Sequence, residues 1–574
     1  MLKKHLENLK RVDSGAVAYT FANALKDYAE SIYFHEKSVA MAITLLKLQE
    51  LNNPFISKEE LFGSSIFEGD VQEIIIKHVD DVWGVITDNL FKFTNEQLKA
   101  FVLFNNSFDK GKGGEVSTPD SVSKLACEIL KIGDNERLIE LCSGKGGFAI
   151  QCLISNSNVI YEGIELNFVA REIALMRLSL IYDDFEIVLG NALDYNSDNK
   201  ADKLFSNYPF MIKTPMLSIC KVKLANAFNI PIEIIQRASS DWLFNLIMIE
   251  QMKETGKAVA IMTNGSTWNN HDKNIRKFFV DNGFIEAVIS LPPKLFADTS
   301  IPTTMIVLSR NNKSIRMIDA TDICVSVRRN NEFAEADIKK IVELLDCDSE
   351  VSLRISKEEL ADNEYILYAS RYLNKSPEIE NGVELETIIK NITRGSQLKA
   401  TELDELKSDS ITPYQYLMLA NVDKGIIDIG EDQYLTTMPK RLEKYCVKNN
   451  SIVLSKIGVP NFKSAVVNIS DDRKLLANGN LFVIELDETK ADPYYIQAYF
   501  SSEAGIAAFK NIYAGVALAT ISLDKIKKMI IPLPDLDEQK KIAERYKACI
   551  DEIAHLKRRL NEITNKLVDI LNEP

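Results

Sequence analysis

Between residues 136 and 310, short apolar segments alternate with helical segments, and this alternation constrains the fold more than any other feature of the chain. Such a pattern is typical of a parallel α/β sheet with helices packed on its faces. The sequence therefore predicts one open, doubly wound sheet, with helices at Val169–Tyr182 and Ser240–Glu254. Its strands are expected at Arg137–Leu141, Val159–Glu165, Phe185–Leu189, Lys203–Ser206, Ala258–Met262, Ile285–Ser290 and Thr304–Leu308.

The pattern changes on both sides of this sheet, as expected for a chain of 574 residues that folds as several domains. Residues 1–105 carry apolar residues at helical spacing and predict a helical N-terminal domain. Residues 106–370 hold the sheet and a connecting stretch with a helix at Glu335–Leu345. Residues 371–535 place β-type segments among turns, which indicates a separate mixed α/β domain, and residues 536–574 predict a long C-terminal helix.

Composition narrows the class of protein. No apolar stretch approaches the roughly 18 residues that a membrane span needs, and the first residues lack the apolar core of a signal peptide, so we expect a cytoplasmic protein without a membrane partner. The eight cysteines form no Cys-x-x-Cys pair and there are five histidines, which argues against a disulfide framework or a metal site. The net charge of −14 still permits nucleic-acid binding through a local basic face.

Glycines follow the first predicted strand in Glu140-Leu-Cys-Ser-Gly-Lys-Gly-Gly-Phe148, where they allow a tight turn and a close approach to a ligand. Alone, this loop would equally suit a structural turn, and its spacing differs from the Gly-x-Gly-x-x-Gly of dinucleotide sites. However, the next strands end in Glu165, which suits ribose hydroxyls, and in Asn191, which can read an adenine edge. Glu140 can accept hydrogen bonds from an ammonium group. Three successive strand ends therefore predict a nucleoside cofactor. The residues expected to bind it are Glu140, Cys142, Ser143, Gly144, Gly146, Gly147, Phe148, Glu165, Leu166, Asn191 and Ala192.

The fourth predicted strand ends in Asn207-Tyr-Pro-Phe210. The exocyclic amine of a base is a poor nucleophile, because its lone pair is delocalised into the ring. The side-chain carbonyl of Asn207 and the backbone carbonyl of Tyr208 can accept its N–H groups and favour the reactive form. Phe210 can stack on a base that has been flipped out of the duplex. By itself, such a segment would be an ordinary strand exit stopped by Pro209. Its position after a cofactor site favours a catalytic role for Asn207, Tyr208, Pro209 and Phe210.

Further motifs accompany these two sites: Ser117-Thr-Pro119, Asn264-Gly265, Ile275-Arg276, Leu291-Pro-Pro-Lys-Leu-Phe296 and Ile301-Pro-Thr-Thr304. With them, residues 110–310 resemble the N6-adenine DNA methyltransferase (modification) subunit of type I restriction–modification systems, in which a helical domain precedes a Rossmann-like methyltransferase sheet. The resemblance implies S-adenosylmethionine as the cofactor and double-stranded DNA as the partner. It also implies that Thr118 and Pro119 close over the methionine end of the cofactor.

Three residues depart from the family pattern. Glu140 and Asn191 each replace an aspartate, and both replacements keep a suitable hydrogen-bonding group. Tyr208 replaces the first proline of Asn-Pro-Pro-Phe. Its backbone carbonyl is retained, but the fixed φ of proline is lost. We therefore expect the loop of Asn207 to be less preorganised than in the family.

The C-terminal part carries a second set of motifs, Asn449–Gly458, Ala477–Asn480, Gly515–Ser522 and Ile530–Gln539. These resemble one half of a type I specificity subunit, in which a target-recognition domain is followed by a long helix. Basic residues cluster in the same region. Such a run is most often a solvated face, but the resemblance makes phosphate contact an alternative. The DNA-binding candidates are Lys440, Arg441, Lys444 and Lys456.

The final helix repeats apolar residues at alternating spacings of three and four, which indicates a seam that packs against another helix. This helix lies either on other helices of the same chain or on a second copy, and a homodimer is slightly favoured. The seam residues are Ile553, Leu556, Leu560, Ile563, Leu567 and Ile570.

Together, the two resemblances predict a sequence-specific methyltransferase that modifies N6 of adenine and carries modification and specificity functions in one chain. Restriction would need a separate subunit, since no nuclease or helicase motif is visible. One alternative is a DNA-binding protein whose methyltransferase fold is impaired at Tyr208. Another is methylation of cytosine N4, although enzymes of that kind more often carry serine where this chain has Asn207.

Overall fold

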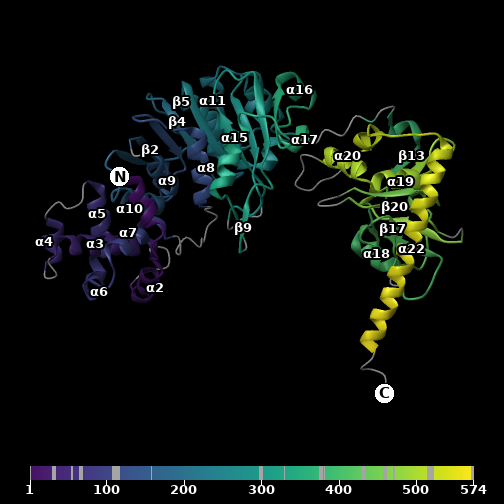
Figure 1. Cartoon of the computed structure of the whole chain (residues 1–574), viewed down its shortest axis with the longest axis horizontal. Helices are drawn as coiled ribbons and strands as arrows, with labels where there is room; N and C mark the ends of the chain where they lie inside the picture. Colours follow the sequence, from purple (N-terminus) through teal and green to yellow (C-terminus); the bar gives the residue numbers. More distant parts are fainter. Residues whose placement is uncertain are drawn as a thin grey trace. The chain divides into compact units, whose positions relative to one another are not determined.

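The computed structural model forms two compact units, Met1–Leu373 and Asn374–Pro574 (Figure 1). The structure describes residues 2–28, 34–52, 56–63, 69–105, 117–156, 158–296, 301–328, 330–373, 379, 382–429, 433–456, 462–469, 472–513 and 523–569. Of the sequence motifs, residues 457–458 of Asn449–Gly458, the whole of Gly515–Ser522 and Ile570 of the helical seam lie outside these described residues.

A nine-stranded sheet with the order β11-β8-β6-β7-β5-β4-β1-β2-β3 organises the first unit. Strands β3, β2, β1, β4 and β5 run parallel to one another, so their carboxyl ends meet at one edge. The strands are β1 (Arg137–Leu141), β2 (Ile160–Glu165), β3 (Phe185–Leu189), β4 (Ala201–Ser206), β5 (Met252–Thr263), β6 (Ile285–Ser290), β7 (Thr303–Leu308), β8 (Ser314–Asp319) and β11 (Ser352–Ser356).

All seven predicted strands are present, but the prediction of a parallel sheet was wrong for β7. This strand runs antiparallel to both β5 and β6. Parallel neighbours need a crossover connection, usually a helix, whereas only twelve residues separate Ser290 from Thr303, and the described part of this connection contains no helix. Strands β8 and β11, which the sequence did not predict, extend the same sheet.

Alternate residues of each strand enter two cores, one on each face of the sheet. Leu138 and Val259 face the core that also contains α8 and α9, whereas Ile139 and Ala258 face the core of α13 and α14. Both faces are therefore covered, as the buried runs of the central strands require. The helices of this part are α8 (Asp120–Leu130), α9 (Gly147–Ser155), α10 (Phe168–Leu178), α11 (Met216–Ala227), α12 (Ile232–Ile235), α13 (Ser240–Gln251), α14 (Lys273–Asp281), α15 (Glu335–Leu344), α16 (Lys357–Asp362) and α17 (Ser370–Leu373).

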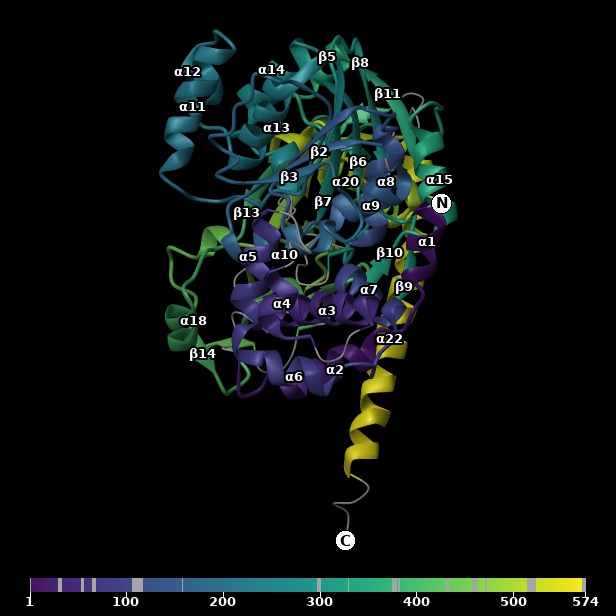
Figure 2. The same cartoon turned by 90° about the vertical axis from the view of Figure 1, so that its left-hand side faces the viewer.

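The N-terminal helices form a bundle beside the sheet (Figure 2). The central helix of the bundle, α3, contacts α5, α7 and α10, which explains why most of its residues are buried. Helix α7 begins with a capping box, in which Thr94 accepts from the backbone of Gln97 and the Gln97 side chain accepts in return. The bundle consists of α1 (Leu2–Leu9), α2 (Gly15–Ala24), α3 (Phe34–Leu51), α4 (Lys58–Gly63), α5 (Asp70–Val79), α6 (Trp83–Asp88) and α7 (Asn95–Phe104).

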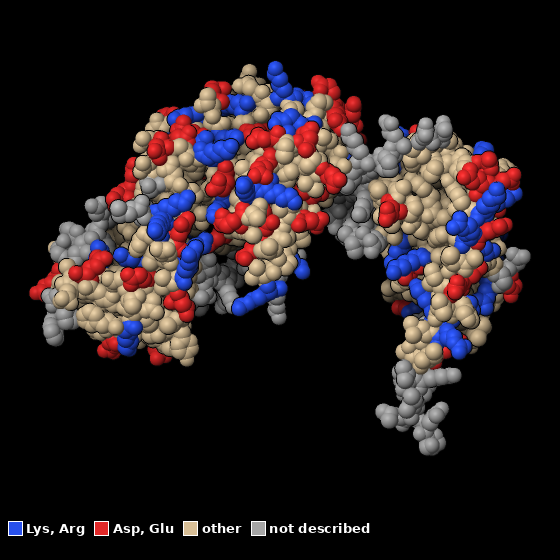
Figure 3. All heavy atoms as spheres, viewed as in Figure 1, with Lys and Arg blue, Asp and Glu red and all other residues tan. Residues whose placement is uncertain are grey.

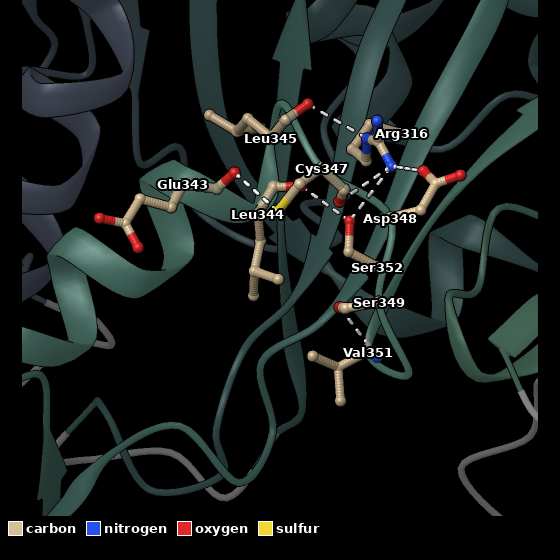
Figure 4. Close-up of polar contacts among 9 residues, drawn as sticks. All are labelled: Arg316, Glu343, Leu344, Leu345, Cys347, Asp348, Ser349, Val351 and Ser352. Carbon is tan, nitrogen blue, oxygen red and sulfur yellow. Dashed lines mark hydrogen bonds and ion pairs between the residues drawn. The ribbon is translucent and has the colours of Figure 1, made fainter.

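Near the edge of the sheet formed by β11, a buried arginine joins the end of α15 to β8 and β11 (Figure 4). Arg316 of β8 donates to the carbonyl oxygens of Leu345 (3.1 Å) and Cys347 (3.2 Å) and pairs with the carboxylate of Asp348. Ser352 of β11 donates to the carbonyl of Leu344 at 2.7 Å. A guanidinium group therefore satisfies carbonyls that the end of the helix leaves unpaired.

The second unit is a mixed α/β domain built on two small sheets. The first has the order β13-β22-β19-β20 and the second the order β14-β18-β15-β21. Helix α22 packs along α19, which begins with Pro493 and is capped by Asp492. The main elements are β13 (Ile389–Arg394), α18 (Ala400–Leu406), β14 (Lys407–Ser408), β15 (Tyr414–Leu417), β18 (Tyr434–Leu435), β19 (Ile452–Ser455), β20 (Ser464–Val466), β21 (Lys474–Ala477), β22 (Leu481–Leu486), α19 (Pro493–Ser501), α20 (Glu503–Tyr513) and α22 (Leu536–Asp569). Within the described part of the chain, no helix combines the length and apolarity that crossing a membrane requires.

Candidate active site

The glycine turn lies at the carboxyl edge of the sheet, between β1 and α9. The backbone is left-handed at Cys142 (φ 62°), Gly144 (φ 55°) and Gly146 (φ 78°). A Cβ atom added to Gly144 or Gly147 would meet no described atom within 4 Å, so the turn faces open space. A Cβ atom on Gly163 of β2 would lie 2.8 Å from the Ser143 hydroxyl, so glycine is needed there for the turn to approach β2.

Glu140 is a buried acid at the end of β1, and only 3% of its surface is exposed. Tyr161 of β2 donates its hydroxyl to Glu140 Oε2 at 2.5 Å. Burial raises the pKa of Glu140 well above its usual range, against the opposing effect of the Tyr161 hydrogen bond, and the nearby Glu165 carboxylate raises this pKa further. A cationic ligand group would stabilise the ionised form of Glu140 and so offset the free-energy cost of burying its charge. The supporting Tyr161 was not singled out in the sequence.

The two other predicted strand ends also reach this edge. Glu165 accepts from the backbone N–H groups of Gly144 and Asn167, both at 2.7 Å, so its carboxylate holds the glycine turn against β2. Asn191 follows β3, and its Oδ1 accepts from the backbone of Leu193 at 3.0 Å. Leu166 is 68% exposed.

Two other predicted cofactor residues lie in the cores on the two faces of the sheet. Ala192 enters the core on the α13 side of the sheet. Phe148 lies in the opposite core and stacks on Phe205 of β4 with ring centroids 3.8 Å apart. The Phe148 ring therefore supports the glycine turn from the core.

The loop after β4, residues 207–211, brings the predicted target site next to the predicted cofactor segment. Asn207 Nδ2 donates to Thr118 Oγ1 at 2.9 Å, and Thr118 and Pro119 immediately precede α8. Pro209 is exposed. Phe210 meets Phe296 edge to face, with centroids 6.4 Å apart, which joins this loop to the Leu291–Phe296 motif. Tyr208, by contrast, points into the protein and is only 1% exposed.

A fully buried carboxylate, Asp241 of α13, supports the same loop. It accepts hydrogen bonds from the Thr263 hydroxyl (2.7 Å), the Ser266 hydroxyl (3.0 Å) and the backbone N–H of Met211 (3.1 Å). Asp241 thus connects the end of β5 to the residue after Phe210. Asp241, which lies in the largely apolar segment Ser240–Ile249, was not singled out in the sequence.

In the second unit, the structure separates the four predicted basic residues. A pocket of about 500 Å³ is lined by Arg441 and Lys444, together with Arg394, Ser396 and Gln397, which were not predicted. Arg441 also pairs with Glu402, and the Lys444 ammonium lies 5.0 Å from the centroid of the Tyr445 ring. Lys440 is exposed and Lys456 is partly buried, and neither is among the residues that line this pocket. Lys and Arg atoms gather over the lower part of this unit in the view of Figure 3.

Two solved structures have a similar fold. The methyltransferase subunit of a type I restriction–modification system from Streptococcus thermophilus aligns with a TM-score of 0.50 and 18% identity, and covers 63% of this chain and 99% of its own. The type IIG restriction endonuclease BpuSI aligns with a TM-score of 0.50 and 12% identity, over 93% of this chain and 74% of its own. These likenesses confirm the predicted fold class, a helical domain followed by a methyltransferase-type α/β sheet.

Sequence comparison gives two family matches. Residues 99–381 match the family described as N-6 DNA Methylase, and residues 401–565 match the Type I restriction modification DNA specificity domain. The prediction that one chain joins a methylase domain to a specificity domain is confirmed.

Curated relatives match the methylase part. The type I restriction enzyme MpnII methylase subunit of Mycoplasma pneumoniae is 25% identical over 315 residues, which are 49% of this chain and 57% of that protein. The MjaVIII methylase subunit of Methanocaldococcus jannaschii is 27% identical over 318 residues, 50% of this chain and 54% of that protein. The chain therefore spans little more than half the length of these two relatives.

Proposed function

We propose that this protein is a site-specific DNA methyltransferase that transfers a methyl group from S-adenosylmethionine to N6 of a flipped-out adenine. The observation that carries the proposal is the hydrogen bond from Asn207 to Thr118. It joins the loop expected to hold the target amine to the segment expected to close over the cofactor. The match to the N-6 DNA Methylase family supports the choice of adenine.

The residues at the glycine turn fit the cofactor. Glu140 offers a buried acid for the methionine ammonium, Glu165 has carboxylate oxygens for ribose hydroxyls, and Asn191 has an amide for the adenine edge. The open space in front of Gly144 and Gly147 gives a ligand access to the turn. When bound, S-adenosylmethionine supplies an electrophilic methyl group.

The target loop performs the remaining chemistry. The carbonyl oxygens of the Asn207 side chain and of the Tyr208 backbone accept the two N–H groups of the adenine amine, which makes its lone pair available for attack. Phe210 stacks on the flipped base. The reaction needs little more than this, because holding the amine in line with a methyl group replaces a bimolecular encounter with a positioned one.

The test is to map modified bases in DNA from a methyltransferase-deficient host after exposure to the wild-type protein or to Asn207→Ala. We expect N6-methyladenine at one recurring sequence with the wild type and at least a hundredfold less with the variant, the scale on which loss of one stabilising group acts. Asn199→Ala is the matched control, because Asn199 is an exposed asparagine at the opposite end of β4. Methylation at cytosine N4, or equal methylation by both proteins, would contradict the assignment.

We further propose that the second unit reads the DNA sequence and that its basic pocket, lined by Arg394, Arg441 and Lys444, contacts phosphates. The match of residues 401–565 to a DNA specificity domain supports this role. Two other partners are proposed: a second copy of the chain through α22, and a separate restriction subunit. The second proposal is supported by the names of the relatives, which are subunits of restriction enzymes.

A further inference from the structure

Tyr208, the residue that departs most from the family pattern, is fixed to α13 by two contacts. Its ring stacks on Phe244, with centroids 4.7 Å apart and planes 10° from parallel. Its hydroxyl donates to Asn245 Oδ1 at 3.2 Å. Asn245 is itself fully buried, and its Nδ2 lies 3.7 Å from the sulfur of Met262 on β5.

The same helix holds the other end of the loop. Asp241 accepts from the backbone N–H of Met211, whose φ of 48° lies in the left-handed region that a methionine rarely adopts. Asp241, Phe244 and Asn245 are spaced by three and four residues, so they share one face of α13. The loop of Asn207 is thus held by a buried face of one helix both immediately after Asn207 and just past Phe210.

We propose that Tyr208 is a positioning residue that, through Phe244 and Asn245, supplies the rigidity that proline provides in the family pattern. A proline at this position restricts the loop through its ring. Here the loop is restricted by burial of an aromatic ring and by one directed hydrogen bond. Tyrosine keeps the same backbone carbonyl as proline, and the proposed function takes this carbonyl as an acceptor of the target amine. The inference rests on the proposed function, since it takes Asn207 as the group that receives the target amine.

The test is a double-mutant cycle on the full-length protein with Tyr208→Phe, Asn245→Leu and the double variant. Each single change leaves one buried polar group without its partner, and we expect kcat for DNA methylation to fall by about tenfold. The double variant removes both partners, so its kcat should fall by no more than either single variant, rather than by about a hundredfold. The KM for S-adenosylmethionine should change less than twofold throughout. Tyr372→Phe is the control, because the buried Tyr372 donates to the carbonyl of Ile366 instead of to α13.

A second measurement does not depend on catalysis. Hydrogen–deuterium exchange of the peptide that spans residues 206–212 should be slow in the wild type and faster in each single variant, because the Met211 amide is held only while the loop is anchored. The inference would be overturned if the kcat of the double variant fell by the product of the two single effects. It would also be overturned if Tyr208→Phe changed neither kcat nor the rate of hydrogen–deuterium exchange. A wild-type protein that methylates no DNA would overturn the proposed function instead, and the exchange experiment would still decide the role of Tyr208.

Discussion

At the scale of single residues, Glu140 and Glu36 are carboxyl groups that lie where ionisation is costly. Glu140 ends β1 at the glycine turn, and Glu36 lies in α3 with no exposed surface and no hydrogen-bond partner for either oxygen among the described residues. Burial raises the pKa of both groups. Glu140 has a proposed ligand, so its ionisation should affect ligand affinity. Glu36 has none, so its ionisation should affect the stability of the fold.

For Glu140, we expect the affinity for S-adenosylmethionine to fall as the pH decreases. The raised pKa means that the carboxyl group without ligand is protonated below that value, whereas an ammonium ligand requires the ionised form. Calorimetric titrations from about pH 5 to about pH 7, where the ligand keeps its ammonium charge, should therefore show tighter binding at higher pH. Glu140→Gln should bind more weakly, with little pH dependence. Binding by the wild type that does not vary with pH would contradict this role for Glu140.

For Glu36, we expect Glu36→Gln to raise the free energy of unfolding of the first unit at neutral pH, because a neutral amide avoids the cost of ionising a buried carboxyl group. A raised pKa contributes stability that is fully present below the ordinary value near 4.3 and is lost as the pH rises through the higher value. His78, Glu172 and Lys145 surround the group, so their charges act on it as well. Thermal melts at neutral and acidic pH provide the measurement. A difference between the variant and the wild type that persists at acidic pH would contradict the explanation.

At the scale of elements, the sequence predicted the bounds of several strands correctly. β1, β3 and β6 have the expected bounds. The end of α13 was predicted at Glu254, but the helix ends at Gln251 because Met252 already pairs with Ala201 as part of β5. Here pairing with a neighbouring strand overrides helical preference, and no local pattern could reveal it.

Helix α22 leaves a row of apolar residues exposed. Ile553, Leu556, Leu560 and Ile563 of α22 are 43–62% exposed. If a second copy covers this seam, Leu556→Glu/Leu560→Glu should convert a dimer into a monomer in sedimentation velocity experiments, because two charges would enter an apolar interface. Arg558→Glu, on an exposed position of the same helix, should leave the dimer intact. A wild-type protein that sediments as a monomer at all concentrations would exclude the homodimer.

At the scale of the whole molecule, a net charge of −14 makes any DNA-binding surface a local one. We expect Arg441→Ala/Lys444→Ala to weaken DNA binding and to reduce the slope of log affinity against log salt concentration by about 2, close to 0.9 for each phosphate that the variant no longer neutralises. Cofactor affinity should not change. Lys339→Ala, an exposed lysine of α15, is the control. If the variant showed the same salt dependence as the wild type, the pocket would not be part of the DNA-binding surface.

The residues of the candidate site that come directly after parallel strands could be predicted from the sequence. Glu140, Glu165 and Asn207 could be identified because parallel neighbours bring their carboxyl ends to one edge. Tyr161, Asp241 and Asn245 could not, since they come from elements whose side chains meet the site only after the fold has formed. Tyr208 shows the limit most clearly, because the sequence indicates a lost proline but not the helix face that receives the tyrosine.

The hydrogen bond between Asn207 and Thr118 also has a thermodynamic consequence. If the cofactor acts on Thr118 and the target adenine acts on Asn207, the two ligands share one contact and their binding free energies are coupled. Reciprocity then requires that the factor by which the cofactor changes the affinity for specific DNA equals the factor by which that DNA changes the affinity for the cofactor. The protein would thus distinguish its own site from other DNA by how tightly it retains the methyl donor.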